Sequence, residues 1–470
     1  MSSGGAPSIL GREHRRLTVG IVLVVTFFAF EEMAVFTVLP TVLRQVGGIH
    51  LYGWAFSGFV LAQLAGIVMA GTLTDRIGMT GPLLAGAGLF VAGLLVDGTA
   101  RTMLVVVVGR AVQGAGAGLM SVVVNVAVGR GYPPELRPRV YAALSTAWVA
   151  PALVGPVLAG LIAQTLGWRP VFLAVIPAVV AVSALAGPAV HHAEHRGTAA
   201  DEGGTGEEGG PGIVVAVGLS AGWVLVLAAL GTRQPVVAPL LALAGLALGV
   251  PALRAVLPAR GGRLRRQQIG TMTVAALATG SFFGAEAYLP LALQSFHHRT
   301  ATEAGLALTT AALSWTSGSW VQARGQARIG PRNLSAAGLA LVAAGVAGVA
   351  LLDWAATPWW VAYLAWGTGG FGMGLVYNSC SVAVLDAAGE GRQGGAVAAL
   401  QVLLTLGIAL GTGLGGAALA WSVSLGHGRA PGLALFDATA VGAALVGVGV
   451  TRLMPGPGKR PAEVAALPPQ

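Results

Sequence analysis

Two neighbouring glutamates, Glu31 and Glu32, interrupt the apolar stretch TFFAFEEMAVFTVLP at residues 26–40. An ionisable side chain at the centre of a membrane helix costs about 2.5–3.5 kcal/mol on insertion scales, so it usually faces the protein interior or a wet cavity. Adjacent helical residues point about 100° apart, so we expect one glutamate to face a cavity and the other a neighbouring helix. Because two close carboxylates cannot both be charged cheaply in a low dielectric, at least one is expected to bind a proton near neutral pH. The alternative is a glutamate that only hydrogen-bonds inside the bundle.

Two further charged residues lie within apolar stretches. Arg110 is expected deep in a membrane span, where it needs a carboxylate partner or carbonyl acceptors. Glu286, in GSFFGAEAYLP, is expected either to face Glu31 across a cavity or to be a satisfied polar residue near a helix end. The polar and aromatic residues of which some are expected to line that cavity are Gln113, Asn125, Trp148, Tyr288, Tyr377, Asn378 and Gln401. The tryptophans expected at the membrane interfaces instead are Trp315, Trp320, Trp359 and Trp360.

The elements that must position these residues are membrane helices. The chain has 470 residues, of which 55% are hydrophobic and only 10% charged, whereas soluble domains are about 25% charged. The expected spans lie near 17–43, 52–74, 80–98, 102–129, 138–165, 170–190, 212–231, 235–256, 268–295, 302–323, 333–352, 358–387, 394–422 and 433–453. We therefore predict an all-α integral membrane protein with fourteen transmembrane helices. The single cysteine, Cys380, excludes an internal disulfide.

The positive residues predict the orientation of these spans. With both termini placed in the cytoplasm, most of the 27 lysines and arginines fall on the cytoplasmic side, as the positive-inside rule requires. The exceptions are Arg110, within a span, and Arg44, Arg101, Arg169, Arg233, Arg299 and Arg429 on the other side. Arginines scattered over loops do not form one basic face, which disfavours a nucleic-acid partner.

Two polar segments and an internal repeat divide the chain. Residues 1–190 are predicted to form one six-helix bundle, 191–267 a loop with two extra helices and a basic linker, and 268–470 a second six-helix bundle. GAGAGLM at 114–120 matches GFGMGLV at 370–376, 256 positions later, and RIG at 76–78 matches RIG at 328–330, 252 positions later. Duplicated bundles around a midplane site are typical of secondary transporters.

Four motifs resemble those of the major facilitator superfamily. GTLTDRIGMT (71–80) resembles its motif A, GRAVQGAGAG (109–118) its motif B, and PALVGPVLAG (151–160) its antiporter motif C. The matching residues are Gly71, Leu73, Asp75, Arg76 and Gly78 in the first, Arg110, Gln113 and Gly114 in the second, and Gly155, Pro156 and Gly160 in the third. FEEMAVFTVLP resembles the first-helix motif of fourteen-helix drug:proton antiporters, in which an acid precedes a proline by nine residues, and this spacing selects Glu31 against Pro40.

The resemblance implies a role for each motif. Glu31 would carry the proton, Arg110 would face the cavity and sense the protonation of Glu31, and Asp75 with Arg76 would form a cytoplasmic gate. Gly155, Pro156 and Gly160 would let a helix pack closely between the two halves. The sequence departs from the family pattern at Met79 and Thr80, where a basic pair is usual, and at Phe36, where an asparagine is expected.

The resemblance also implies the activity: a proton-coupled transporter that exports hydrophobic or cationic small molecules by alternating access. It would be a monomer in a bacterial cytoplasmic membrane, neither an enzyme nor dependent on a cofactor or metal, with protons, a small-molecule substrate and the bilayer as partners. HHAEH at 191–195 fits a zinc motif formally but has no evident third ligand. The open alternatives are a dedicated exporter of one native lipid or self-made antibiotic, and a non-transporting membrane receptor or assembly factor.

Overall fold

Every regular element in the described part of the chain is a helix. The computed structural model describes residues 8–11, 14–133, 135–198, 213–257, 263–388 and 393–456. The first bundle contains α1 (Arg15–Val46), η1 (Ile49–Leu51), α2 (Trp54–Ile77), α3 (Thr80–Thr99), α4 (Met103–Gly131), α5 (Arg137–Thr165), α6 (Arg169–Leu173) and α7 (Val175–Thr198). The rest contains α8 (Ile213–Gly231), α9 (Val237–Val256), α10 (Arg263–Phe296), α11 (Ala301–Ala350), η2 (Leu351–Asp353), α12 (Val361–Ala388), α13 (Gln393–Ser424), α14 (Ala430–Val450) and η3 (Thr451–Leu453).

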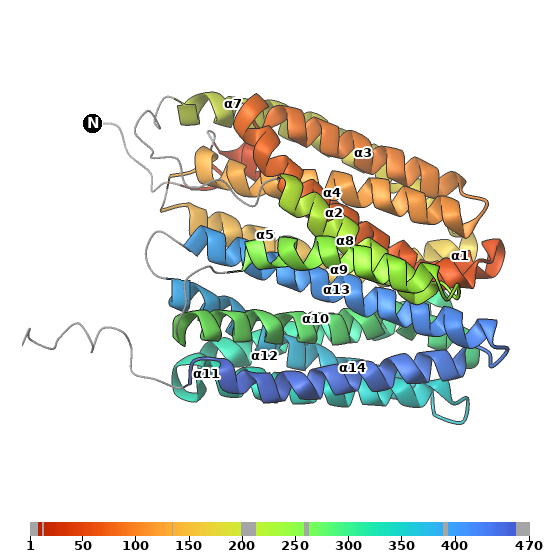
Figure 1. The fold of residues 1–470 in the computed structure, drawn as a ribbon. Helices are drawn as coiled ribbons and strands as arrows, with labels where there is room; N and C mark the ends of the chain where they lie inside the picture. The colour runs from red at the N-terminus through yellow and green to blue at the C-terminus, as the bar shows by residue number, and fades with distance from the viewer. Residues whose placement is uncertain are drawn as a thin grey trace, which may run out of the picture.

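The long helices run side by side along one direction (Figure 1). In that view α3 and α4 lie in the upper part and α10, α12 and α14 in the lower part, with α8 and α9 in front. Helix α8 packs on α2 and α13, one helix from each part, and α9 packs on α8. Of the two extra helices, α8 thus lies against both bundles, and the proposed domain boundaries remain a prediction.

Eleven helical segments in the described residues are long and apolar enough to cross a bilayer. One of them, α11, consists of two helices joined at a kink, because Gly330 has a non-helical φ of 79° and ψ of 159° and is followed by Pro331. Both legs of α11 pack on the same stretch of α12, so the chain folds back at Gly330. The multi-pass helical membrane fold is confirmed, while the exact number of fourteen crossings remains a prediction.

The internal repeat reappears in the packing of the helices. In each half, glycines on one helix leave no room for a side chain because the backbone of the next helix fills that space. In the first half the contacts are Gly114–Phe59, Gly118–Gln63, Gly116–Gly86 and Gly93–Gly109. In the same order, their counterparts in the second half are Gly370–Ala311, Gly374–Trp315, Gly372–Gly338 and Gly345–Ala365. Each member of a pair lies 252 or 256 positions from its counterpart, the same offsets as in the sequence. Thus α2, α3 and α4 pack in the same register as the first leg of α11, its second leg and α12.

The two halves meet closely at the end of the bundle that carries residues 47–53 and 297–300, which we call the sealed end. A Cβ on Gly53 of α2's N-cap would lie 2.6 Å from the Cα of Gly416 in α13, and one on Gly160 of α5 would lie 2.6 Å from the backbone of Thr302 in α11. The hydrogen bonds across the halves here are Arg44 Nη2 to Gln294 Oε1 (3.1 Å), Gln294 Nε2 to Thr37 O (3.2 Å), Tyr52 Oη to Ala287 O (3.2 Å) and Gln164 Nε2 to Thr302 Oγ1 (2.8 Å). These contacts between backbones and side chains join the halves at this end.

Candidate functional site

Arg110 and Glu31 form an ion pair inside the first bundle. Arg110 Nη1 donates to Glu31 Oε1 at 2.5 Å and to Gln113 Oε1 at 2.6 Å, while its Nε donates to Ala55 O at 3.3 Å. The guanidinium carbon also lies 4.1 Å from the centre of the Phe59 ring, a cation–π distance. Arg110 is only 2% exposed and Glu31 1% exposed. The expected carboxylate partner of Arg110 is therefore Glu31.

The position of Arg110 corrects one expectation. The resemblance implied that Arg110 faces the cavity, but its side chain lies within the bundle, against Ala55 and Phe59 of α2. The physical reason is the backbone contact between α4 and both α2 and α3 at successive glycines, which leaves the guanidinium enclosed between helices. Gln113, expected to line the cavity, is also fully buried and bonded to Arg110.

Glu32 lies within electrostatic range of Glu31, of Arg110 and of Glu286 in the other half. Its side chain is half-buried, and its charge acts on Glu286 of α10. Glu286 is 4% exposed, and its Oε2 has no hydrogen-bond partner among the described residues. Glu32 is therefore within electrostatic range of Glu286, while the expectation that Glu286 faces Glu31 remains a prediction. The 100° between neighbouring helical positions separates the two roles, as expected.

Aromatic rings surround Glu286 on its own half. Phe282, one turn before Glu286, stacks on Trp366 of α12 at 4.5 Å between ring centres, and Trp315 of α11 lies edge-on to Phe282 at 5.7 Å. Tyr377 packs on Trp315 at 5.7 Å. The buried indole of Trp366 lies close to the carboxylate of Glu286. These rings, with Phe283, form what we call the aromatic cluster: Phe282, Phe283, Trp315, Trp366 and Tyr377.

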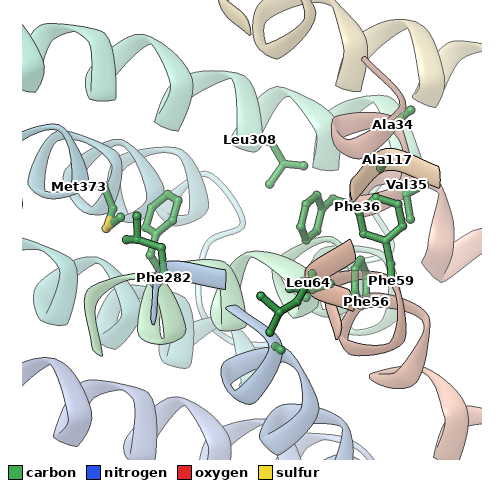
Figure 2. Close-up of a cluster of buried hydrophobic side chains, with 14 of the residues drawn as sticks. Ala34, Val35, Phe36, Phe56, Phe59, Leu64, Ala117, Phe282, Leu308 and Met373 are labelled. Carbon is green, nitrogen blue, oxygen red and sulfur yellow. The ribbon is translucent and has the colours of Figure 1, made fainter. Parts of the chain in front are cut away.

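The aromatic cluster lies apart from the aromatic residues of the first half. Figure 2 shows Phe282 beside Met373, while Phe36, Phe56 and Phe59 of α1 and α2 gather on the opposite side of the view. Trp315 belongs to the cluster, so its predicted place at a membrane interface is wrong. Trp320 and Trp360 are 61% and 50% exposed, in agreement with an interfacial position. The sequence signal that could have located the cluster is the run of aromatic residues one turn before Glu286.

The other candidate cavity residues differ in exposure, and their place in one cavity remains a prediction. Tyr288 is buried near the sealed end, where its hydroxyl donates to Thr412 O at 2.5 Å. Asn125 and Gln401 are exposed, Trp148 is 37% exposed and lies edge-on to Phe28, and Asn378 Nδ2 reaches Gly374 O at 3.5 Å. Tyr288, two residues after the buried Glu286 on the same helix, also packs its ring on Phe436.

The turn between α2 and α3 holds the predicted gate. Gly78 has a φ of 79°, a left-handed conformation that favours glycine, and Gly71 has open space around its Cα. Arg76 is exposed, while the side chain of Asp75 lies outside the described residues. Glu194 from the end of α7 was missed as a member of this region: its Oε2 accepts from Thr80 Oγ1 at 3.1 Å, and its carboxylate lies against Gly78.

The predicted antiporter motif lies at the contact between the halves. A Cβ on Gly305 of α11 would lie 2.6 Å from Pro156 O, and Gly155 faces Phe30 and Met33 of α1 at ordinary contact distance. With Gly160 against Thr302, these residues place α5 in backbone contact with α11. The expected close approach of this helix to the other half is present; its role in transport remains a prediction.

Asp97 is a residue that the sequence reasoning missed. It lies in the last turn of α3, is fully buried, and neither of its carboxylate oxygens has a hydrogen-bond partner among the described residues. Its Oδ1 lies against Gly109, the residue before Arg110. The available signal was an aspartate within the predicted span 80–98, close in sequence to the arginine of the next span.

Comparison with known proteins identifies the family. Residues 21–412 match the sequence profile of the Major Facilitator Superfamily. A probable multidrug-efflux transporter of Mycobacterium tuberculosis, Rv1634, is 29% identical over 431 residues, which cover 86% of this chain and 87% of that protein. The multidrug transporter protein MdtP of Bacillus subtilis is 24% identical over 169 residues, 36% of this chain and 31% of that protein.

Solved structures share the fold. A POT family peptide transporter superimposes with a TM-score of 0.66 at 17% identity and covers 93% of this chain and 97% of its own. The human organic anion transporter MFSD10 superimposes with a TM-score of 0.58 at 18% identity, over 93% of this chain and 99% of its own. The match to the family over most of the length, rather than these distant likenesses, shows that the protein is a multi-pass membrane transporter and not an enzyme. The chain belongs to the Major Facilitator Superfamily.

Proposed function

We propose that this transporter exports hydrophobic or cationic small molecules in exchange for protons. The observation that carries the proposal is the set of acids around one arginine: Glu31 paired with Arg110, and Glu32 within electrostatic range of Glu286 in the opposite half. Such residues within membrane helices usually mark ion or proton pathways. The relatives named as multidrug-efflux transporters support the substrate class.

The facing carboxylates explain how a proton and a cation would compete. Glu32 and Glu286 come from different halves, and no basic residue is bonded to either of them in the described structure. Two like charges in a low dielectric repel strongly, so a proton or a bound cation must stand between them when the halves approach. The aromatic cluster beside Glu286 supplies flat surfaces for cation–π contacts with such a substrate.

Protonation of Glu31 would link this competition to the conformational change. A neutral Glu31 no longer compensates Arg110, so the buried guanidinium must find another partner or rearrange. A ligand changes a conformational equilibrium only through different interaction energies in the two states. With both termini in the cytoplasm of a bacterium, the sealed end would be external, and the described conformation would be the inward-facing member of the pair.

The test uses the purified chain in proteoliposomes with ethidium as the cationic probe. We expect an imposed proton gradient to drive ethidium transport by the wild type, and Glu31→Gln and Glu286→Gln to abolish that coupling. Glu135→Gln, at an exposed glutamate outside the helices, is the matched control and should behave as the wild type. Wild-type rates in Glu31→Gln would contradict the proton role. Binding of ethidium without any transport or proton movement would favour a receptor.

A further inference from the structure

Asp97 is a second buried carboxyl group on which the charge of Arg110 acts. Its side chain is fully buried and both oxygens lack a hydrogen-bond partner among the described residues. The charges that act on it most are the guanidinium of Arg110, which attracts it, and the carboxylate of Glu31, which repels it. One buried positive charge therefore serves two buried carboxylates, and in this conformation it is bonded to Glu31.

The contact between α3 and α4 builds a place for Asp97. Its Oδ1 occupies the space in which a Cβ of residue 109 would stand, so only glycine fits there. One turn earlier on α3, a Cβ on Gly93 would lie 2.7 Å from Gly109 O, which shows that the two backbones touch along this stretch. The carboxylate is thus held between helices, beside the residue that carries the guanidinium.

Charge balance requires one proton on this group of three. If Arg110, Glu31 and Asp97 were all charged, an uncompensated anion would remain in the interior, at a cost of several kcal/mol. One proton shared between the two carboxyls makes the group neutral. In the conformation described, Glu31 has the salt bridge, so the acid that is neutral is Asp97.

Few other charges face Asp97. From α6, Arg169 donates its Nη2 to Ala100 O at 3.0 Å, and Arg101 in the following loop is exposed. From α1, Glu32 lies next to Glu31 and within electrostatic range of Arg110. The titratable residues of α2 and α7 lie at the opposite ends of those helices, away from the last turn of α3.

We propose that Arg110 alternates between Glu31 and Asp97 as a proton passes from Asp97 to Glu31, an inference that rests on the proposed proton-coupled function. The proton leaves the carboxyl of Asp97 and arrives on the carboxylate of Glu31, and the guanidinium keeps its charge and transfers its ion pair to Asp97. The group stays neutral before and after. Asp97 lies in the last turn of α3 beside the sealed end, while Glu31 lies in the middle of α1, so the exchange moves the proton inward along the bundle.

The first test compares Asp97→Asn with the wild type in proteoliposomes loaded with ethidium. We expect Asp97→Asn to lose proton-driven transport but to keep ethidium counterflow, because the Glu31–Arg110 pair and the facing acids are intact. Asp386→Asn, at an exposed aspartate of α12, is the matched control. Proton-driven transport in Asp97→Asn equal to that of the control would overturn the inference. A wild type that moves no proton would instead overturn the proposed function itself.

A second test needs no substitution of Asp97. Infrared spectra of the full chain with carbon-13 label in the aspartate carboxyls report protonated aspartic acid by its carbonyl band. In an Asp353→Asn/Asp437→Asn background, which removes the other aspartates that are buried among the described side chains, we expect such a band at neutral pH. Adding Glu31→Gln together with Glu32→Gln removes the other two carboxylates on which the charge of Arg110 acts, so Asp97 should become its anionic partner and the band should disappear. A band absent from the background protein, or one that persists with both glutamate substitutions, would contradict the exchange.

Discussion

At the scale of single residues, the site consists of charged side chains within the helices, of which Arg110 and Glu31 form a buried ion pair. Arg110 has three hydrogen bonds and a ring contact, all inside the bundle. Its partner Glu31 is enclosed with it, whereas Glu32, the next residue, is half-buried and acts across the boundary between the halves. The two neighbouring glutamates therefore differ: the negative charge of Glu31 is compensated by Arg110, whereas that of Glu32 requires a proton or a cation.

This difference predicts the stability of variants at the pair. Arg110→Ala leaves Glu31 buried without a counter-charge, which costs about 3–5 kcal/mol for a broken buried ion pair. Removing both charges with Arg110→Ala/Glu31→Ala leaves no buried charge, so most of that loss should be recovered while proton-driven transport remains absent. Thermal unfolding in detergent measures the first effect and liposome transport the second.

The control for that experiment is Arg101→Ala, because Arg101 is exposed in the loop before α4. It should unfold within about 0.5 kcal/mol of the wild type, as most surface substitutions do. A single Arg110→Ala variant as stable as this control would show that the pair is not buried in the way described.

At the scale of the elements, glycine decides how the helices pack. α4 meets α2 and α3, and α12 meets both legs of α11, through glycines whose Cα atoms touch the facing backbone. Close approach of this kind is a common way for membrane helices to associate, since lipid offers them little hydrophobic driving force. The same contacts hold Arg110 and Asp97 inside the first bundle.

Alanine at Gly114 is expected to destabilise the fold. Its methyl group would meet the carbonyl of Phe59, and overpacking of this kind costs about 1–3 kcal/mol. The repeat predicts the same effect for Gly370→Ala against Ala311. Gly129→Ala, on the same helix as Gly114 but with nothing within 4 Å, is the matched control and should be neutral or stabilising because alanine favours helix. Thermal midpoints of the purified variants test the ranking; equal midpoints for the two α4 variants would contradict it.

At the scale of the whole molecule, two similar halves are joined at one end. The α2–α13 and α5–α11 contacts are counterparts in the repeat, since Gly53 corresponds to Gly305 and Gly160 to Gly416. Gln294 adds hydrogen bonds to Thr37 and Arg44 of α1. Alternating access requires these contacts to break and others to form elsewhere, as one half moves relative to the other.

A reversible link at the sealed end should therefore stop turnover. In a Cys380→Ala background, Thr41→Cys with Gln294→Cys places two thiols where the native side chains are 3.2 Å apart. We expect a short, reducible thiol cross-linker to abolish ethidium transport and a reducing agent to restore it. The two single-cysteine proteins serve as controls and should keep transport after the same treatment. Undiminished transport by the linked protein would contradict a moving interface at this end.

Much of this architecture could be predicted because it depends on local and repeated patterns. The low charge content and long apolar runs required membrane helices, and the recurring glycines predicted the duplicated packing that the structure contains. A lone arginine in a span required a carboxylate partner or carbonyl acceptors, and the helical angle between Glu31 and Glu32 indicated that they face different neighbours. These inferences follow from hydration energy and helix geometry, which act on each segment by itself.

Other features depended on which helices meet, and only the tertiary structure decided them. Trp315 lies in the aromatic cluster, and the hydroxyl of the buried Tyr288 donates to Thr412 O of α13. Asp97 lies against Gly109, the residue before Arg110, because α3 and α4 are in close contact at that glycine. A sequence pattern gives the face of a helix but not the neighbour that covers it. Partners of a buried charge are therefore settled by long-range packing.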